Sequence, residues 1–514
     1  MKCVLRFVRV FFPAGVFCIG ALIGFANAGT DSTLEAPAFP VEHGPWPVGY
    51  RTALTYDAGR SFGARAEVGG AVHPDLRSRP VRIHLWYPAV AGTSPAMRYG
   101  DFVLAADPLG ERSHAEDAKV LAAYKARMLE RGVEEARLDA LLAAPTRARR
   151  DAAPERGPFP LIVYAPSINA DSYENALFFE YLAGHGFVVA SSACIGAEEP
   201  EVGRDLRGAL AQLGDVRHVL RSVSGERFVD ANHVGLMGFS WGGTSVLLLA
   251  LQHAGIDAVV TLDGGYAFPR YRSIPEATPW WAPRDLRAAF LHFTLLDDDR
   301  DLSFAARSLY ADTWGRRVPG FRHADFATDA ILKRRWAAAD SLAAVLMKEH
   351  AAIQRSVLAF FGAYLEKDGA AADRLKDEVP RGAATGWNVR PALPAPPPAA
   401  QFDEIIAEQG VDAAVARFHE ARRLDPEVVI FGENRLLRYA VEWGPERAED
   451  MWKLLVINNE AWPHSAETHY WMGQVELVRG DEAAARERLE TALRLDPEHE
   501  RARNLLARIT GSGG

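Results

Sequence analysis

The side chains best suited to chemistry are a serine, an aspartate and a histidine that follow one another along the chain. Ser240 stands in the pentapeptide Gly238-Phe-Ser-Trp-Gly242, between an apolar run at residues 234–237 and a small-residue helical pattern that starts at Gly243. A glycine on each side lets a strand and a helix meet in a tight turn that exposes the serine hydroxyl. The turn also puts the hydroxyl at a helix N-terminus, where free N–H groups favour a developing negative charge. The pattern predicts a nucleophilic serine, and the alternative is a glycine-rich turn with an incidental serine.

A serine hydroxyl is a weak nucleophile until a histidine takes its proton, and the histidine needs a carboxylate that orients it. His323, in a turn-rich loop at residues 319–326, is the favoured base, whereas His292 lies inside an apolar run and is expected to be a core residue. For the carboxylate, Asp263 ends an apolar run before two glycines, and Asp297 opens an acidic run one strand later. Both follow the serine and precede the histidine, which is the chain order of a hydrolase triad. Position alone leaves both open and favours Asp263.

The elements that must position these side chains are predicted from hydrophobic periodicity. Two alternating runs, residues 47–57 and 79–88, are typical of antiparallel strands, and His84 in the second run is expected to be a sheet residue. Buried strands and helices then alternate, with strands at 159–166, 187–192, 233–237, 258–263 and 287–296, and helices at 173–185, 204–224 and 342–366. This alternation indicates a mostly parallel sheet with helices on both faces. With the turn around Ser240, it predicts an α/β-hydrolase fold over residues 45–369.

Residues 100–157 interrupt this pattern with a segment rich in alanine, arginine, glutamate and leucine. Helical spacing is present at residues 118–131 and again at 133–142. Between two strand regions, such a segment is expected to be a helical insertion. It either forms a flap that shapes the acyl or alcohol pocket or decorates a surface loop, and the sequence leaves both open.

Seven short segments between residues 44 and 367 carry a more specific signal: Pro47-Val-Gly49, Trp86-Tyr-Pro88, Pro160-Leu-Ile-Val-Tyr164, residues 181–190, Gly238-Phe-Ser-Trp-Gly-Gly243, Leu262-Asp263 and His323-Ala-Asp-Phe326. Together they resemble the plasma-type platelet-activating-factor acetylhydrolases and their bacterial relatives near the dienelactone hydrolases. The resemblance implies a serine carboxylic-ester hydrolase that works through an acyl-enzyme. Its implied substrates are small-molecule or lipid esters with short or oxidised acyl groups, phospholipids among them.

The resemblance also bears on the assignment of the site. In that family the acid ends the strand directly after the nucleophile, where Asp263 stands, 23 residues after Ser240. This favours Asp263 over Asp297. The resemblance further implies an oxyanion hole formed by the backbone N–H of Trp241 and that of Ile168 or one of its neighbours.

The chain departs from this family at two places near the site. Pro166-Ser167 stand where His-Gly is usual, and Phe239 stands where a histidine is usual. The first departure falls in the loop of the implied oxyanion hole. Neither touches the three predicted triad positions.

The C-terminal part predicts a linker followed by helical repeats. Residues 370–401 are rich in proline and are expected to form a stiff, extended linker. In residues 402–510, Ala485, Leu489 and Ala492 precede Pro497 at the offsets at which Ala414, Phe418 and Ala421 precede Pro426, 71 residues earlier. This spacing is close to two 34-residue units and resembles tetratricopeptide repeats. Such repeats offer a concave surface to a protein partner, and the alternative is a helical cap on the hydrolase or a surface for self-association.

The N-terminus is typical of a secretory signal. Basic residues at 2, 6 and 9 precede an apolar run at residues 10–25 and the small-x-small motif Ala26-Asn-Ala28. We expect a signal peptide at residues 1–28, an extended leader at 29–44 and export to the periplasm or the medium, the alternative being an uncleaved membrane anchor. Cys194 is then the one cysteine left in the mature chain, expected as a buried strand residue.

Composition narrows the classes of function. The formal net charge of −9, with both signs interspersed, argues against a nucleic-acid-binding surface. No zinc-type spacing or dinucleotide fingerprint is present in the sequence, so no metal or cofactor is expected. Two rivals to an ester hydrolase stay open: a peptidase or acyl transferase on the same fold, and a binding protein in which the repeats matter and the hydrolase domain is a degenerate scaffold.

Overall fold

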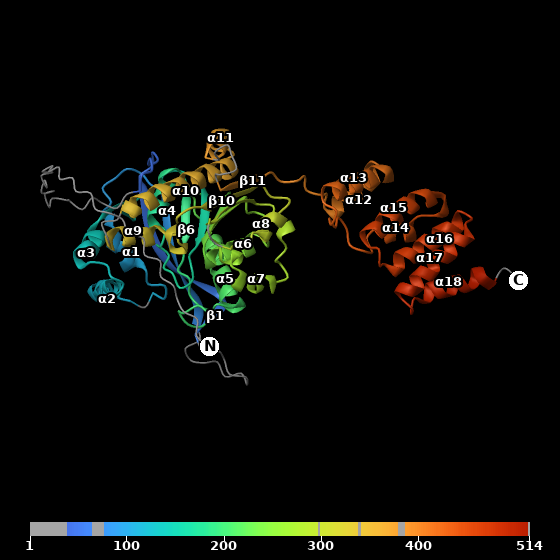
Figure 1. Cartoon of the computed structure of the whole chain (residues 1–514), viewed down its shortest axis with the longest axis horizontal. Coiled ribbons are helices and arrows are strands. Elements are labelled where there is room, and N and C mark those ends of the chain that lie inside the picture. Colours follow the sequence, from blue (N-terminus) through green and yellow to red (C-terminus); the bar gives the residue numbers. More distant parts are fainter. Residues whose placement is uncertain are drawn as a thin grey trace, which may run out of the picture.

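The computed structural model describes residues 39–63, 77–110, 112–296, 299–337, 341–378 and 386–511. These residues form an α/β domain and, at the C-terminal end of the chain, a domain built from helices (Figure 1). The predicted signal peptide, most of the leader, and Asp297 with its neighbour Asp298 lie outside the described residues.

One sheet organises the α/β domain. Its strands are β1 (Val48–Phe62), β2 (Arg77–Pro88), β3 (Ala96–Arg98), β4 (Pro145–Arg150), β5 (Phe159–Ala165), β6 (Val188–Ser191), β7 (Val229–Phe239), β8 (Ala258–Leu262), β9 (Ala289–Leu295), β10 (Thr313–Val318) and β11 (Trp387–Arg390). Across the described part of the sheet their order is β11-β10-β9-β8-β7-β5-β6-β2-β1-β4-β3. From β6 to β10 neighbouring strands run parallel, while β2 is antiparallel to both β1 and β6. This is the predicted α/β-hydrolase fold, with the parallel strands in the middle of the sheet.

Two hydrophobic cores cover the two faces of this sheet. Consecutive side chains of β5 alternate between them, Ile162 and Tyr164 in one core and Leu161 and Val163 in the other, as the two-residue period of a strand requires. The first core includes residues of α4 (Ala176–Gly184) and α10 (Ser341–Leu365). The second includes residues of α5 (Leu206–Val223) and α6 (Trp241–Ala250). Because both faces are covered, the strands β5, β6, β8 and β9 are predominantly apolar along their length, as their sequences predicted.

The predicted insertion is helical, and short strands before and after its helices connect it to the sheet. It contains α1 (Tyr99–Ala105), α2 (Asp117–Glu130) and α3 (Glu135–Ala143), close to the expected helices. The short strands β3 and β4 flank these helices, and β4 pairs with both β3 and β1 at the sheet edge. The helices α1 and α3 pack against each other, and α3 packs against α9 (Thr328–Ala337).

The segment predicted to be an extended linker is more ordered than expected. It begins with α11 (Gly369–Asp377), which packs on α10, and continues to β11, which pairs antiparallel with β10. Neither β10 nor β11 was predicted. β10 has only six residues, two of them arginines, and all four residues of β11 are exposed or half-buried, so neither carries a clear hydrophobic pattern. Pairing with the sheet, rather than local sequence, makes them strands.

The C-terminal domain contains helices in close antiparallel succession (Figure 1). They are α12 (Ala399–Glu408), α13 (Val411–Leu424), α14 (Leu437–Glu442), α15 (Ala448–Ala461), α16 (Ala466–Val478), α17 (Glu482–Leu495) and α18 (Glu500–Gly511). Ala414 and Phe418 in α13, and Ala485, Leu489 and Ala492 in α17, are fully buried. The tetratricopeptide assignment itself stays a prediction.

A buried carboxylate of the helical domain contacts the α/β domain. Asp425, just after α13, accepts a hydrogen bond from the Tyr310 hydroxyl (2.8 Å) and forms an ion pair with Arg284 (2.9 Å) of the α/β domain. The Tyr310 ring packs in the same hydrophobic cluster as Phe402 of α12. Arg284 also pairs with Glu427 (2.7 Å), whose side chain is largely exposed.

No helix within the described ranges is long and apolar enough to span a bilayer. Cys194 is buried but lies in the loop after β6 rather than in the strand, next to the Trp241 side chain.

The substitution Asp425→Ala tests the contact between the domains. We expect it to lower the free energy of unfolding by about 2 kcal/mol, because it leaves the Tyr310 hydroxyl without its acceptor and removes the buried one of the two acidic partners of Arg284. Chemical denaturation followed by tryptophan fluorescence measures the change. Glu427→Ala is the matched control, since it removes an exposed partner of the same arginine and should cost at most about 1 kcal/mol. Equal effects of the two substitutions would contradict this account.

Candidate active site

Ser240 lies in a strained turn between β7 and α6. Its backbone has φ 52° and ψ −119°, a conformation that residues other than glycine rarely adopt. A Cβ on Gly242 would lie 2.0 Å from the carbonyl oxygen of Ala165, and one on Gly238 would lie 2.5 Å from that of Gly242. Only glycine therefore fits on either side of the serine. The Ser240 N–H donates to the Leu262 carbonyl (3.0 Å), which ties the turn to β8.

The structure brings the serine, histidine and aspartate singled out in the sequence into one hydrogen-bonded chain. The Nε2 of His323 lies 2.8 Å from Oγ of Ser240, and its Nδ1 lies 2.6 Å from Oδ2 of Asp263. Asp263 directly follows β8, and His323 begins a short 3-10 helix, His323–Phe326, after β10. His292, by contrast, is buried inside β9, where burial lowers its pKa to about 4.

Two aromatic rings hold the His323 imidazole. The Phe239 ring, from the residue before the serine, and the Phe268 ring each lie 5.0 Å from the imidazole, centroid to centroid. The side chain of His323 stays 37% exposed. The packing fixes the ring plane and leaves an open edge toward solvent.

Arg300 is a functional residue that the sequence did not reveal. Its buried guanidinium donates two hydrogen bonds of 2.8 Å to Asp263, one to each carboxylate oxygen, and lies 3.6 Å from the centroid of the Phe268 ring. Burial favours a raised pKa for Asp263, but the hydrogen bonds and charges of Arg300 and His323 outweigh burial and hold the pKa below its usual value. Arg300 follows the three aspartates at residues 297–299, and no pattern in the sequence singled it out.

The two predicted oxyanion donors come from different segments of the chain. Trp241 opens α6, Ile168 lies in the loop after β5, and their side chains share a small apolar cluster. Within the described part of the chain, neither backbone N–H donates a hydrogen bond to a protein group. The Ser167 N–H differs, since it is taken by Glu174. The geometry therefore leaves the N–H groups of Trp241 and Ile168 available to an incoming oxygen.

Glu174 holds this loop and was also missed by the sequence. Its buried carboxylate accepts hydrogen bonds of 2.7 Å from the Tyr164 hydroxyl, the Ser167 N–H and the Ser167 hydroxyl. Burial raises its pKa to about 7, against the effect of these bonds. Ser167, which stands where the resembled family has glycine, thus has a partner for its hydroxyl.

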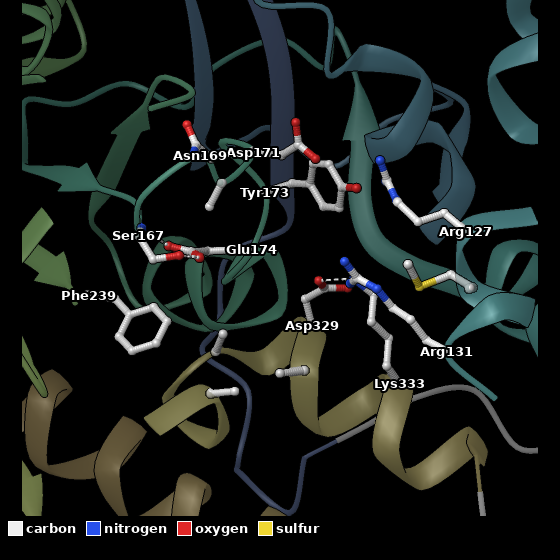
Figure 2. Close-up of a pocket in the computed structure, with 15 residues that line it drawn as sticks. Arg127, Arg131, Ser167, Asn169, Asp171, Tyr173, Glu174, Phe239, Asp329 and Lys333 are labelled. Atoms are coloured by element: carbon white, nitrogen blue, oxygen red, sulfur yellow. Dashed lines mark hydrogen bonds and ion pairs between the residues drawn. The ribbon is translucent and has the colours of Figure 1, made fainter. Parts of the chain in front are cut away.

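A pocket of about 360 Å³ lies near the candidate site, and Figure 2 shows the side chains that line it. Phe239 and Ala324, the neighbours of Ser240 and His323, line one part of it. The loop from Ser167 to Glu174 lines another, and α2 and α9 complete it. The insertion therefore forms a wall of this pocket, which favours the flap over the decorated loop. No group of three or more metal-ligating side chains occurs among the residues described.

Comparisons with known proteins give a distant structural match. No family model matches the chain, and no curated protein matches its sequence. Among solved structures, the chain is similar to a ferulic acid esterase from Streptomyces cinnamoneus, with a TM-score of 0.46 and 20% sequence identity. The match covers 70% of this chain and 99% of the esterase chain.

Glu174→Gln tests the buried carboxyl under the loop. Because the pKa of Glu174 is about 7 when folded and 4.5 is the ordinary value, its contribution to stability is present below pH 4.5 and is lost as the pH rises to 7. We expect the free energy of unfolding of the glutamine variant, relative to the wild type, to rise by up to about 3 kcal/mol across this range. Urea denaturation at a series of pH values measures it. The exposed control Glu130→Gln should show a difference that does not change with pH, and a flat difference for Glu174→Gln would refute the account.

Proposed function

We propose that this protein is a serine carboxylic-ester hydrolase. The observation that carries the proposal is the unbroken chain of short hydrogen bonds from Asp263 through His323 to Ser240, on a turn that only glycine neighbours permit. The Trp241 N–H, directly after the serine, and the Ile168 N–H, whose side chain packs in the same cluster as that of Trp241, donate to no group among the described residues. A nucleophile, a base, an orienting acid and oxyanion donors are the parts that acyl transfer requires.

In the proposed reaction, Ser240 Oγ attacks the ester carbonyl while His323 Nε2 takes the hydroxyl proton. The carbonyl oxygen becomes an oxyanion and accepts hydrogen bonds from the Trp241 and Ile168 N–H groups. His323 returns the proton to the departing alcohol, which leaves an acyl-enzyme on Ser240. A water molecule, deprotonated by the same nitrogen, then attacks the acyl group and releases a carboxylic acid and the free serine.

The family resemblance and the N-terminal pattern extend the proposal. The resemblance to platelet-activating-factor acetylhydrolases favours esters with short or oxidised acyl groups, phospholipids among them. The signal-peptide pattern at residues 1–28 favours action in the periplasm or outside the cell. The helical repeats then serve a protein partner or self-association.

Activity assays distinguish the ester hydrolase from the two rival functions. A peptidase or acyl transferase on this fold would prefer amide substrates or added alcohol acceptors over hydrolysis of esters. A binding protein with a degenerate scaffold would carry a serine that does not react. Panels of p-nitrophenyl esters of graded chain length, compared with matched anilides, decide between these classes and define the acyl pocket.

Labelling with a fluorophosphonate probe tests the nucleophile. We expect the wild type to be labelled and Ser240→Ala to remain unlabelled, with kcat on p-nitrophenyl esters lowered by roughly 10⁴-fold or more. Ser222→Ala, an exposed serine of α5, is the control and should be labelled like the wild type. If the folded wild-type protein does not react with the probe, the proposed function is wrong.

The pH dependence of kcat/KM tests Arg300. In Arg300→Met the bare Asp263 carboxylate favours the protonated imidazole more strongly, so the acid limb should move up by about 1 pH unit. Arg300→Lys keeps the charge but not the two-pronged contact, so the acid limb should stay in place while kcat falls by about tenfold. If both variants shift the limb equally, the charge of Arg300 has no part in setting it.

A further inference from the structure

The pocket beside the triad is lined by six charged side chains with equal numbers of each sign. The acids are Asp171, Glu174 and Asp329, and the bases are Arg127, Arg131 and Lys333. The net charge alone says little about a ligand. What matters is which of these charges are already paired within the protein.

Two of the three acids that line the pocket are engaged by protein groups. Asp329 forms an ion pair with Lys333 and accepts a hydrogen bond from the Tyr99 hydroxyl (2.5 Å). Glu174 accepts its three hydrogen bonds from the protein. Burial, and then the nearby charge of Asp329, raises the pKa of Asp171. Among the acids of the pocket, Glu174 and Asp329 are thus satisfied by protein partners, while the charges of Arg127 and Lys333 act on Asp171 against the effect of burial.

Arg127 and Arg131 form no direct ion pair among the residues that the structure describes, although the charge of Arg127 acts on Asp171 at longer range. Neither guanidinium makes a hydrogen bond or ion pair with any residue that the structure describes, although Arg127 lies 5.5 Å from the centroid of the Tyr124 ring. The two residues are four apart at the C-terminal end of α2, so their side chains leave the same face of the helix. Two guanidinium groups on one face match the geometry of a carboxylate or phosphate.

The same pocket is lined by residues that adjoin the reacting groups in the sequence. Phe239, next to the nucleophile, and Ser167, next to the predicted oxyanion donor Ile168, line its other side. In Figure 2, Phe239 and the two arginines lie on opposite sides of the pocket. A ligand that extends from Ser240 past Phe239 into this pocket would meet the arginine pair on the opposite side.

We propose that Arg127 and Arg131 bind an anionic group, a carboxylate or a phosphate, carried by the ester substrate at a distance from the scissile carbonyl. This inference rests on the proposed function and names a substrate class for it. Lys333 contributes less to binding, because Asp329 offsets its charge. The insertion then acts as the specificity element of the enzyme.

Paired substrates test the proposal with the full-length protein. On the acyl side, mono-p-nitrophenyl glutarate is compared with the uncharged p-nitrophenyl pentanoate. On the alcohol side, 4-acetoxybenzoate and 4-acetoxyphenyl phosphate are compared with methyl 4-acetoxybenzoate. We expect kcat/KM of the wild type to favour the anionic member of at least one pair by about tenfold, and the preference to weaken as salt screens the charges. The pair that shows the preference identifies the side and the anion.

The variant Arg127→Met/Arg131→Met should lower the anionic-to-neutral ratio of kcat/KM by about tenfold. Lys119→Met, an exposed cation on the same helix that does not line the pocket, should leave the ratio unchanged. Ester hydrolysis with the same ratio in the wild type and the double variant would overturn the anion subsite while leaving the ester hydrolase standing. Absence of hydrolysis of every ester by folded wild type would overturn both.

Discussion

The arrangement of the site depends on keeping a negative charge at Asp263, whose side chain has no exposed surface. A lone ion in such a place costs several kcal/mol in lost hydration, so it persists only if it is fully paired. Arg300 occupies both carboxylate oxygens and His323 adds a third contact. Arg300 and Asp263 form a neutral pair, and the imidazole is oriented by one short hydrogen bond and two flanking rings rather than by an uncompensated anion.

The parts of the site that the sequence predicts are those whose signal is local. Ser240 stands in a short motif with two glycines, and Asp263 and His323 follow predicted strands, so their order and spacing suffice to find them. Arg300 and Glu174 do not follow from any local pattern, because each matters through a partner at a distance, the triad acid in one case and the loop after β5 in the other. Tertiary contact, not residue type, makes them functional.

In the fold, too, some elements follow from local sequence and others depend on tertiary contacts. Long apolar runs predict the parallel strands and the α/β-hydrolase class correctly, since both faces of those strands are buried. The strands β3, β4, β10 and β11 are short and partly polar, and the sheet beside them completes their hydrogen bonds. The insertion is anchored through one of these strands, β4. The carboxylate of Glu180 in α4 accepts hydrogen bonds from the backbone N–H groups of Arg147 and Ala148 in β4. Burial raises the pKa of Glu180 to about 7. The wall of the pocket is thereby tied to the core of the domain.

The pairing of β11 with β10 gives the segment between the domains a protective role. In this sheet β10 would otherwise present a row of unpaired backbone groups, the template on which chains of different molecules associate. Four residues of β11, held in place by the helices that follow, cover that row. The open edge of the described sheet thereby passes from β10, with six residues, to β11, with four, and a short edge strand is a poorer template for such association.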